Sequence, residues 1–537
     1  MSRASLRATV PQSDAPPDLD RLVRKAVAAH QNGALGQADR LYRAALAHDP
    51  DHFDALHLLG SLSLQRGRLA DAQRFLAAAV RCNPRAADAR SDLGVAYHGA
   101  GDYAAALASH DAALAIEPGN AGYINRRAAA LVRLGRSAEA LAALDRILSV
   151  QPGHADALGN RGNVHISLNR PDAAIADYDA ARRAAGDSAQ ILTNRAHALR
   201  RLDRLAEAVA DLLRALKLRP DLAEAHFELA LAQLALGDFA SGWNEYEWRW
   251  ATAAFAPSRR GFTSPQWNGT QTLAGRTVLL HAEQGLGDTM QFVRYAPLVA
   301  QRGANVILEV QPELVALLAG TPGVARVLAY GERLPPFDLH CPLMSLPRAF
   351  ATNEATIPAD IPHIRVPPET AARWADRLPA GPPSIGMVWA GRPTHHNDLN
   401  RSLPLASLAP LLRRGDLRFV SLQRDARAGD AAILRDLPNV IDAGPDLHDF
   451  TETAALISRL DAVVAVDTAV AHLAGALGKP LLLLLPHAAD FRWLRGRDDS
   501  PWYPSARLLR QDKFGDWSGV LARLDAHLGE FTRGATA

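Results

Sequence analysis

The first half of the chain repeats one pattern of small and helix-ending positions every 34 residues. An alanine stands twelve residues before the position of the closing proline in each of six units. An alanine or glycine stands twelve residues before that alanine. Small residues let two helices approach closely, and proline ends a helix. The pattern therefore predicts paired helices that stack over residues 19–256. Gly186 interrupts the closing prolines once; these are Pro50, Pro84, Pro118, Pro152 and Pro220.

The predicted array has about seven helical pairs, and the last one departs from the pattern. Gly242 replaces the alanine of the seventh unit, and no proline closes it. We expect this unit to cap the array. The aromatic block from Trp243 to Trp267 is then expected to join the helices to the second half, with a boundary near residue 257.

Short apolar runs alternate with helical stretches in the second half, which is typical of strand–helix–strand units. We predict helices from Thr289 and Pro312, and two parallel sheets. The fold class is thus an all-α solenoid followed by two facing Rossmann-like lobes, at 257–380 with the linker and at 381–537. Their ligands should bind outside the carboxyl ends of the strands. The predicted strands are Thr277–Ala282, Asn305–Val310 and Val324–Leu328, then Ser384–Trp389, Leu417–Leu422, Asn439–Asp442, Ala462–Asp467 and Pro480–Leu485.

Composition places the chain among ordinary globular proteins of several domains. Its 537 residues are 48% hydrophobic and 22% charged, and the formal net charge is +2. So small a charge exerts no general attraction on nucleic acid or anionic lipid, so any partner must be recognised locally, and we expect no nucleic acid among the partners. The longest apolar run, Leu481–Leu485, is far too short for a membrane helix, so no integral membrane segment is expected.

The chain ends and the cysteines point to a cytoplasmic location. Residues 1–18 are proline-containing and polar, without the apolar core of a signal peptide, and we expect a disordered leader there. Only Cys82 and Cys341 occur, which gives no disulfide framework and no zinc-binding spacing. We expect a reducing compartment, no metal site and no cofactor.

A glycine-containing turn follows the first predicted strand and delivers a carboxylate to the start of a helix. It contains Gly285, Gly287 and Asp288. In one interpretation the glycines let substrate approach the backbone, and Asp288 takes a proton from an acceptor hydroxyl as general base. In the other, Asp288 is only the N-cap of the helix.

The second lobe carries a buried predicted strand that turns directly into a helix. The free amides of a helix N-terminus and its partial positive charge favour a phosphate group. A diphosphate leaving group would therefore fit here, although Asp467 or Thr468 could be plain caps and His472 a packed residue. Gln423, Asp449 and Glu452 are further nucleotide contacts or, equally, caps and strand-end residues. The donor-binding candidates of the turn are Asp467, Thr468, Ala469, Val470 and His472.

The 34-residue period, with a small residue at the eighth position, alanine at the twentieth and proline at the thirty-second, resembles the tetratricopeptide repeat. Such solenoids bind extended peptides in a concave groove. The O-GlcNAc transferases carry an asparagine ladder along this groove, and Asn160 and Asn194 resemble two of its rungs. With Asn125 and Asn163 they are the acceptor-groove candidates, unless all four are ordinary polar residues.

Residues 272–530 resemble the heptosyltransferase family of GT-B glycosyltransferases. The resemblance is carried by Asp288 after its glycine turn, by Asp467-Thr468 with His472-Leu473, and by Lys479-Pro480. It implies that Asp288 is the base and that the Asp467-Thr468 turn holds the donor. It also implies that a basic residue before the first helix of the second lobe, here Arg401, neutralises the diphosphate.

The chain also departs from this family. Ala469 and Ala471 replace its usual glycine and serine, so the donor need not be ADP-heptose. The tail, with Arg492, Trp493 and Trp502-Tyr503, resembles that of the bacterial tetratricopeptide-linked subgroup of these transferases.

The function predicted is metal-independent, inverting transfer of a sugar from a nucleotide-sugar donor to a protein or peptide that the solenoid recruits. Two alternatives stay open. The acceptor could be a glycan or a lipid-linked sugar, with the solenoid serving only for recruitment. The protein could also be a non-catalytic scaffold whose second half merely binds nucleotide.

Overall fold

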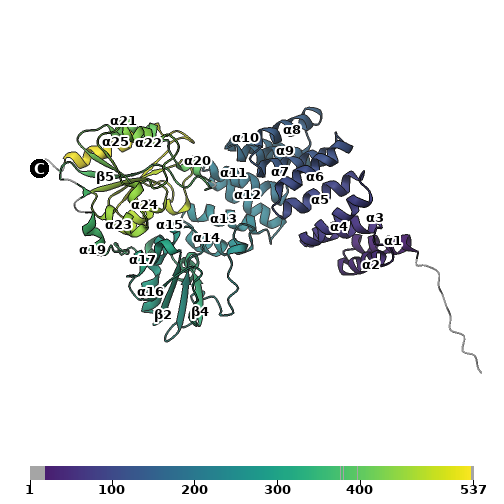
Figure 1. Ribbon diagram of the computed structural model, residues 1–537, viewed down its shortest axis with the longest axis horizontal. Coiled ribbons are helices and arrows are strands. Elements are labelled where there is room, and N and C mark those ends of the chain that lie inside the picture. The colour runs from purple at the N-terminus through teal and green to yellow at the C-terminus, as the bar shows by residue number, and fades with distance from the viewer. Residues whose placement is uncertain (1–17, 375–376, 379, 396, 534–537) are drawn as a thin grey trace, which may run out of the picture. The chain divides into compact units, whose positions relative to one another are not determined.

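The computed structural model describes residues 18–374, 377–378, 380–395 and 397–533. The chain forms two compact units, Met1–Asp187 and Ser188–Ala537. The first unit contains five helical pairs. The second contains two more pairs together with both α/β lobes (Figure 1). The predicted limits of the leader, the array and the two lobes stay predictions, and the leader up to residue 17 lies outside the described residues.

Each 34-residue period forms two helices, as predicted. The second helix of a pair ends two residues before the closing proline, and Gly186 takes that place after α10 with a φ of 80°. The repeat helices are α1 (Leu19–Gln31), α2 (Leu35–His48), α3 (Phe53–Gln65), α4 (Leu69–Cys82), α5 (Ala87–Gly99), α6 (Tyr103–Ile116), α7 (Ala121–Arg133), α8 (Ser137–Val150), α9 (Ala155–Ser167), α10 (Pro171–Ala185), α11 (Ala189–Arg201), α12 (Leu205–Leu218), α13 (Ala223–Ala235) and α14 (Phe239–Tyr246).

The small residue at the eighth position of a repeat lies where the two helices of a pair touch. A Cβ atom added at Gly60 would lie 2.5 Å from Leu76 of the partner helix, and one at Gly162 would lie 2.5 Å from the ring of Tyr178. Interiors are close-packed, so a larger residue would push the helices apart. This explains why the repeat keeps alanine or glycine there.

The seventh pair, which we expected to cap the array, is packed against the first lobe. Its residues Phe239, Trp243 and Tyr246 are buried in one hydrophobic core with Trp267 and Val278 of the first lobe. The missing proline fits this role, because the chain continues into the short helices η1 (Glu247–Ala251) and η2 (Ala256–Ser258) on its way to the lobe. The aromatic block thus joins helices and lobe as expected.

The first lobe is a four-stranded parallel sheet in the order β3-β2-β1-β4. The sequence had predicted the first three strands but not β4, which pairs with β1. Its helices are α15 (Leu286–Phe292), η3 (Val293–Tyr295), α16 (Ala296–Gln301), η4 (Pro312–Leu314), α17 (Val315–Leu318), η5 (Leu343–Ser345), α18 (Leu346–Ala349) and η6 (Glu354–Thr356). Its strands are β1 (Thr277–His281), β2 (Asn305–Val310), β3 (Val324–Ala329) and β4 (Leu339–Pro342).

The second lobe is a six-stranded parallel sheet in the order β10-β9-β8-β5-β6-β7. In chain order this is the 3-2-1-4-5-6 arrangement of dinucleotide-binding folds, and the order reverses between β5 and β8. Five strands had been predicted, and β10 had not. They are β5 (Ser384–Val388), β6 (Arg418–Ser421), β7 (Val440–Asp442), β8 (Ala462–Val466), β9 (Leu481–Leu485) and β10 (Ala506–Arg510).

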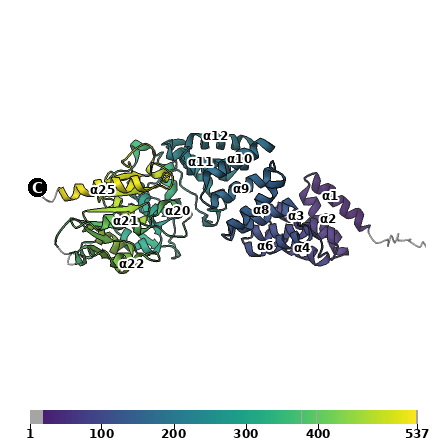
Figure 2. The same cartoon turned by 90° about the horizontal axis from the view of Figure 1, so that it is seen from above.

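Helices cover both faces of this second sheet (Figures 1 and 2). Leu408, Leu434 and Leu524, from α21, α22 and α25, pack on one face. Ala455 and Leu473, from α23 and α24, pack on the other. The helices after the first lobe are α19 (Pro368–Arg373), α20 (Asp398–Arg401), α21 (Leu405–Leu412), α22 (Asp430–Arg435), η8 (Gly444–Asp446), α23 (Phe450–Ser458), α24 (Ala469–Ala476), η9 (Phe491–Trp493) and α25 (Ser518–Arg533).

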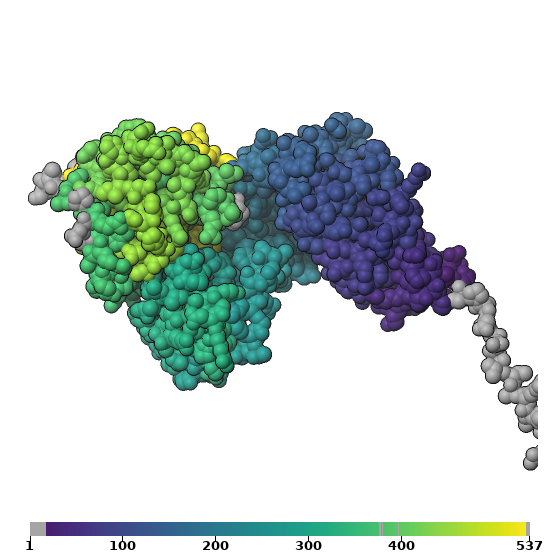
Figure 3. Space-filling model, in the orientation of Figure 1, coloured from purple at the N-terminus to yellow at the C-terminus, as the bar shows by residue number. Residues whose placement is uncertain are grey.

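The two lobes are in contact, as the teal first lobe and the green to yellow second lobe show in Figure 3. Arg294 of η3 is buried and donates to the carbonyl oxygen of Trp502 (2.8 Å) and to that of Pro358 (3.1 Å). The fold class is therefore the predicted one, a helical solenoid followed by two parallel-sheet lobes. In the described part of the chain no helix is both long and apolar enough to cross a membrane.

Candidate active site

Asp288 lies in the first turn of α15, beyond the carboxyl end of β1. The N-cap is Gly285, and Asp288 is the third helical residue, so Asp288 is not the N-cap itself but the carboxylate of a capping box. Its Oδ2 reaches back to accept from the amide of Gly285 (2.8 Å), and its Oδ1 accepts from Arg492 of the second lobe. The side chain is 22% exposed. Burial raises the pKa of Asp288 above its ordinary value, against the opposing charge of Arg492.

The turn between β8 and α24 has the features of an anion site. Thr468 is the N-cap, but its side chain forms no capping bond, and its buried hydroxyl oxygen has no partner among the residues that the structure describes. Ala471 and His472 are the first amides that donate to the Thr468 carbonyl (3.0 and 3.3 Å). The amides of Ala469 and Val470 precede them, at positions that lack an intrahelical acceptor.

Arg401 extends from α20 to this turn. Its Nη1 donates to the carbonyl oxygen of Asp467 (2.8 Å), and its side chain is 15% exposed. A Cβ atom at Gly391, just after β5, would lie 2.5 Å from the guanidinium, so a larger residue there would displace the Arg401 side chain. The structure therefore brings Arg401 and the Asp467-Thr468 turn together where the strand order reverses, which is where such sheets bind ligands.

His472 is a packed residue, one of the two interpretations that the sequence left open. It is 6% exposed, its Nδ1 lies 3.0 Å from the Tyr503 hydroxyl, and its ring stacks on Trp493. Burial lowers the pKa of His472 to about 3, so the ring is neutral. A Cβ atom at Gly287 would lie 2.6 Å from His472. The absence of a side chain at Gly287 thus lets α15 pack on α24, and its role in the approach of substrate stays a prediction.

Three other candidates are caps or strand-end residues. Gln423 accepts from the amide of Ala390 (3.1 Å) and donates to the Asp425 carbonyl (3.3 Å), which uses both ends of its carboxamide. Asp449 is the N-cap of α23 and accepts from the amide of Glu452 (2.8 Å). Glu452 in turn accepts from the indole of Trp374 (2.7 Å) and pairs with Arg373 (2.7 Å). These side chains hold the lobe together.

The sequence did not single out Arg492 and Asp490 as site residues. Arg492 is 7% exposed and donates to Asp288, to Asp490 (2.7 Å) and to Gln291 (2.9 Å). Burial alone would raise the pKa of Asp490, but the charge and hydrogen bonds of Arg492 outweigh it and lower that pKa. Both residues follow β9 and therefore lie at the carboxyl edge of the sheet. This was the signal that could have identified them.

The carboxyl edges of the two sheets thus share one polar cluster. The first lobe contributes Asp288, and the second contributes Arg401, Asp467, Asp490 and Arg492. Burial and the charge of Asp490 raise the pKa of Asp467 to about 6, while Arg401 opposes the shift. Carboxylates that can hold or take a proton therefore lie beside fixed cations and an unpartnered hydroxyl at a helix start. Such an arrangement suits proton removal next to an anionic leaving group.

The four asparagines proposed for the acceptor groove have different surroundings. Asn125 is 6% exposed, so it is not a groove residue, because neighbouring helices cover it. Asn163 is exposed and accepts from the hydroxyl of Tyr178 on the paired helix (2.8 Å). Asn160 and Asn194 are half-buried at the same position of successive repeats, and Asn194 accepts from Gln190 (2.9 Å). For these two the groove role stays a prediction.

Both halves of the chain match known family models. Residues 29–93, 125–189 and 196–237 match models of the tetratricopeptide repeat. Residues 433–507, which contain the turn at Asp467 and Thr468, match the model of glycosyltransferase family 9 (heptosyltransferase).

Relatives of known sequence or structure cover parts of the chain. Protein FlbA of Caulobacter vibrioides is 29% identical over 340 residues, which are 58% of this chain and 56% of that protein. The chain thus matches a little over half the length of that relative. A tetratricopeptide repeat protein from Parabacteroides merdae is 17% identical with a TM-score of 0.39, over 41% of this chain and 86% of its own. PilW, a type IV pilus biogenesis factor, is 18% identical with a TM-score of 0.35, over 40% of this chain and 100% of its own.

Proposed function

Because the chain joins tetratricopeptide repeats to a heptosyltransferase-like glycosyltransferase domain, we propose that it transfers a sugar from a nucleotide-sugar donor to a protein or peptide acceptor. One observation carries the proposal. Asp288 at the carboxyl edge of the first sheet meets Arg492 from the carboxyl edge of the second, near Arg401 and the start of α24. The reaction is inverting and uses fixed protein charges where other transferases use a metal.

Asp288 is the general base of this reaction. Each carboxylate oxygen has two lone pairs, so the bonds from Gly285 and Arg492 leave acceptor capacity for a hydroxyl. The oxygen of the acceptor hydroxyl attacks the anomeric carbon as its proton moves to Asp288, and the bond to the diphosphate oxygen breaks on the opposite face. Arg492 keeps the carboxylate oriented and favours its charged form.

The leaving group is stabilised from the second lobe. Arg401 supplies a full positive charge, and the start of α24 supplies the amides of Ala469 and Val470 and the hydroxyl of Thr468. A helix N-terminus favours an anion by about 0.3–1 kcal/mol, and by up to about 2 kcal/mol when partly buried. These groups are in place before the charge develops, which is what makes such stabilisation effective.

A panel of nucleotide sugars tests the proposal directly. We expect one of the UDP-, GDP-, ADP-, dTDP- or CMP-sugars to bind the full chain in calorimetry, and to raise its unfolding temperature. A ligand at 100 times its dissociation constant stabilises by about 2.7 kcal/mol. The Asp288→Asn variant, screened in parallel, prevents turnover of the donor. Silence with both proteins would contradict the proposal and favour the non-catalytic scaffold.

Recruitment of the acceptor by the repeats is tested with a chain that starts at Ser188. The second compact unit retains α11–α14 and both lobes, so the shortened chain should bind and hydrolyse the donor as the full chain does. Modification of a protein acceptor should fall about tenfold or more, because five of the helical pairs that form the groove, including the one with Asn160, are removed. Equal rates of protein modification by the two chains would refute recruitment of the acceptor by the groove.

A further inference from the structure

Two aromatic residues of the last helical pair lie between the two lobes. The Trp243 ring meets Phe292 of α15 edge to face, with centroids 6.1 Å apart at 87°. It meets Phe491 of η9 in the same way, at 5.7 Å and 84°. Tyr246 also packs on Phe491, at 6.0 Å. One helix of the repeat array therefore contacts both of the short helices that carry Asp288 and Arg492.

The two rings that Trp243 supports are the ones on which Arg492 lies. The guanidinium carbon is 4.4 Å from the centroid of Phe491 and 5.7 Å from that of Phe292. Edge-to-face packing fixes the orientation of a ring, and a cation is held over its face. Phe292 and Phe491 thus contact both Trp243 and the guanidinium of Arg492, and that guanidinium donates to Asp288. Phe292 and Phe491 therefore connect Trp243 to the Asp288–Arg492 pair.

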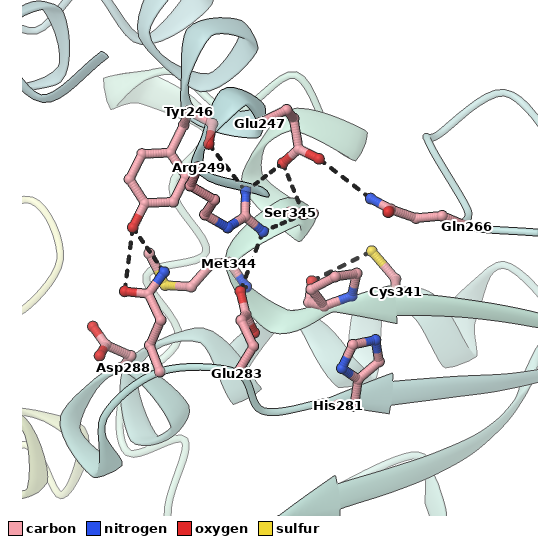
Figure 4. Close-up of polar contacts among 12 residues, drawn as sticks. Tyr246, Glu247, Arg249, Gln266, His281, Glu283, Asp288, Cys341, Met344 and Ser345 are labelled. Atoms are coloured by element: carbon pink, nitrogen blue, oxygen red, sulfur yellow. Dashed lines mark hydrogen bonds and ion pairs between the residues drawn. The ribbon is translucent and has the colours of Figure 1, made fainter. Parts of the chain in front are cut away.

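The same helical pair also holds the turn that leads to Asp288. The Tyr246 hydroxyl accepts from Nε2 of Gln284 (2.9 Å), the residue just before Gly285. Arg249 of η1 is fully buried and donates to Glu283 (3.2 Å), to Ser345 (2.7 Å) and to Glu247 (2.8 Å). Figure 4 shows Arg249 among these three partners, and Asp288 on the same side of the turn as Tyr246.

Burial of this extent goes beyond what a simple tether would need. Trp243 and Tyr246 are each 2% exposed, and Arg249 is not exposed at all. A flexible linker does not require a buried ion pair, yet Arg249 pairs with Glu283, a buried carboxyl that follows the first strand. These contacts instead fix the conformation of the turn at residues 283–285.

We propose that the last helical pair is part of the transferase site, and that Trp243 and Tyr246 are positioning residues that hold Asp288 and Arg492 in register across the two lobes. The inference rests on the proposed function for its catalytic consequence. The ordering of α15 and η9 by the last helical pair does not depend on the proposed function, and it can be measured without turnover.

The test uses the full chain with Tyr246→Phe and Trp243→Phe. The first removes only the hydroxyl bonded to Gln284, and the second leaves a smaller ring between Phe292 and Phe491. The matched control is Tyr123→Phe, which removes a similar hydroxyl from a buried tyrosine in the first unit, where it donates to Asp88. Arg249 is left unchanged because its replacement would remove the cationic partner of both Glu283 and Glu247.

Amide hydrogen exchange by mass spectrometry is the primary measurement. We expect exchange at 283–289 to rise roughly tenfold in Tyr246→Phe, and exchange at 490–493 to rise similarly in Trp243→Phe, with no change there in the control. In turnover, kcat should fall roughly tenfold with the donor dissociation constant unchanged, because the base is displaced while the donor turn in the second lobe is intact.

The outcomes separate this inference from the proposed function. Unchanged exchange in both segments would overturn the inference, whatever the activity. Increased exchange with no sugar transfer by the unmodified chain would contradict the proposed function and leave only the ordering of α15 and η9 by the repeat established. If Trp243→Phe fails to fold, Tyr246→Phe still decides the result, since phenylalanine retains the packing of the ring.

Discussion

Replacing Asp288 with asparagine should leave donor binding nearly unchanged and lower the rate of transfer by about 10²- to 10⁴-fold, the usual contribution of a general base. Asparagine can still accept the amide of Gly285 through its side-chain oxygen, so the start of α15 is retained. What is lost is the capacity to take a proton. Single-turnover transfer and donor calorimetry on the same preparations would measure the two effects separately.

The pH dependence of this variant sharpens the assignment. Because burial raises the pKa of Asp288, its base form becomes populated at a higher pH than that of an ordinary aspartate. Transfer by the unmodified chain should therefore rise with pH on its acid limb, and the residual rate of Asp288→Asn should not share the limb. The control is Asp102→Asn, a change at the N-cap of α6 in the first unit. A variant that transferred at the normal rate would show that another group is the base.

Replacing Arg401 with methionine should lower transfer by about 10²- to 10³-fold, the cost of removing one donor that faces developing negative charge. The thioether keeps much of the length of the side chain, while the bond to the Asp467 carbonyl and the positive charge at the start of α24 disappear. Affinity for the nucleoside diphosphate product should fall by about 10- to 100-fold, the value of a charge-assisted hydrogen bond. Calorimetry with the diphosphate and initial rates with the sugar donor would check both.

Arg427 provides a matched control for Arg401. It pairs with Asp398, the carboxylate that also lies 4.0 Å from Arg401, but it has no bond to the Asp467 turn. Arg427→Met should therefore have a much smaller effect than Arg401→Met, and Arg401→Lys should restore part of the rate because it returns the charge without the planar fork. Equal losses of transfer rate in the two methionine variants would mean that the contacts of both arginines with Asp398, and not the positive charge of Arg401 at the phosphate, account for the effect.

Sequence patterns predicted the repeats and most strands because both follow from local periodicity. The 34-residue period gave the helical pairs, and buried runs such as Leu481–Leu485 became strands. The strand β4 was missed because Leu339–Pro342 is short and contains a histidine and a proline. The strand β10 was missed because Arg507 and Arg510 interrupt its apolar run. Their pairing depends on neighbours distant in the sequence.

The candidate site was predicted only as far as single turns could reveal it. Asp288, Arg401 and the Asp467-Thr468 turn each follow a strand, so their approximate place could be inferred. The partnership of Asp288 with Arg492 joins residues 204 positions apart and could not be seen in either turn alone. Likewise the contact of Gly287 with the ring of His472, from the other lobe, could not be inferred from the glycine turn alone.

The division of the chain at Asp187 and Ser188 has an evolutionary consequence. The five helical pairs before this point fold in a unit of their own, whereas the last two share the core of the lobes. Duplication or loss of whole 34-residue units upstream of Asp187 would therefore change the proposed peptide-binding surface and leave the proposed transfer site unchanged. The last pair, in contrast, should diverge in step with the catalytic half.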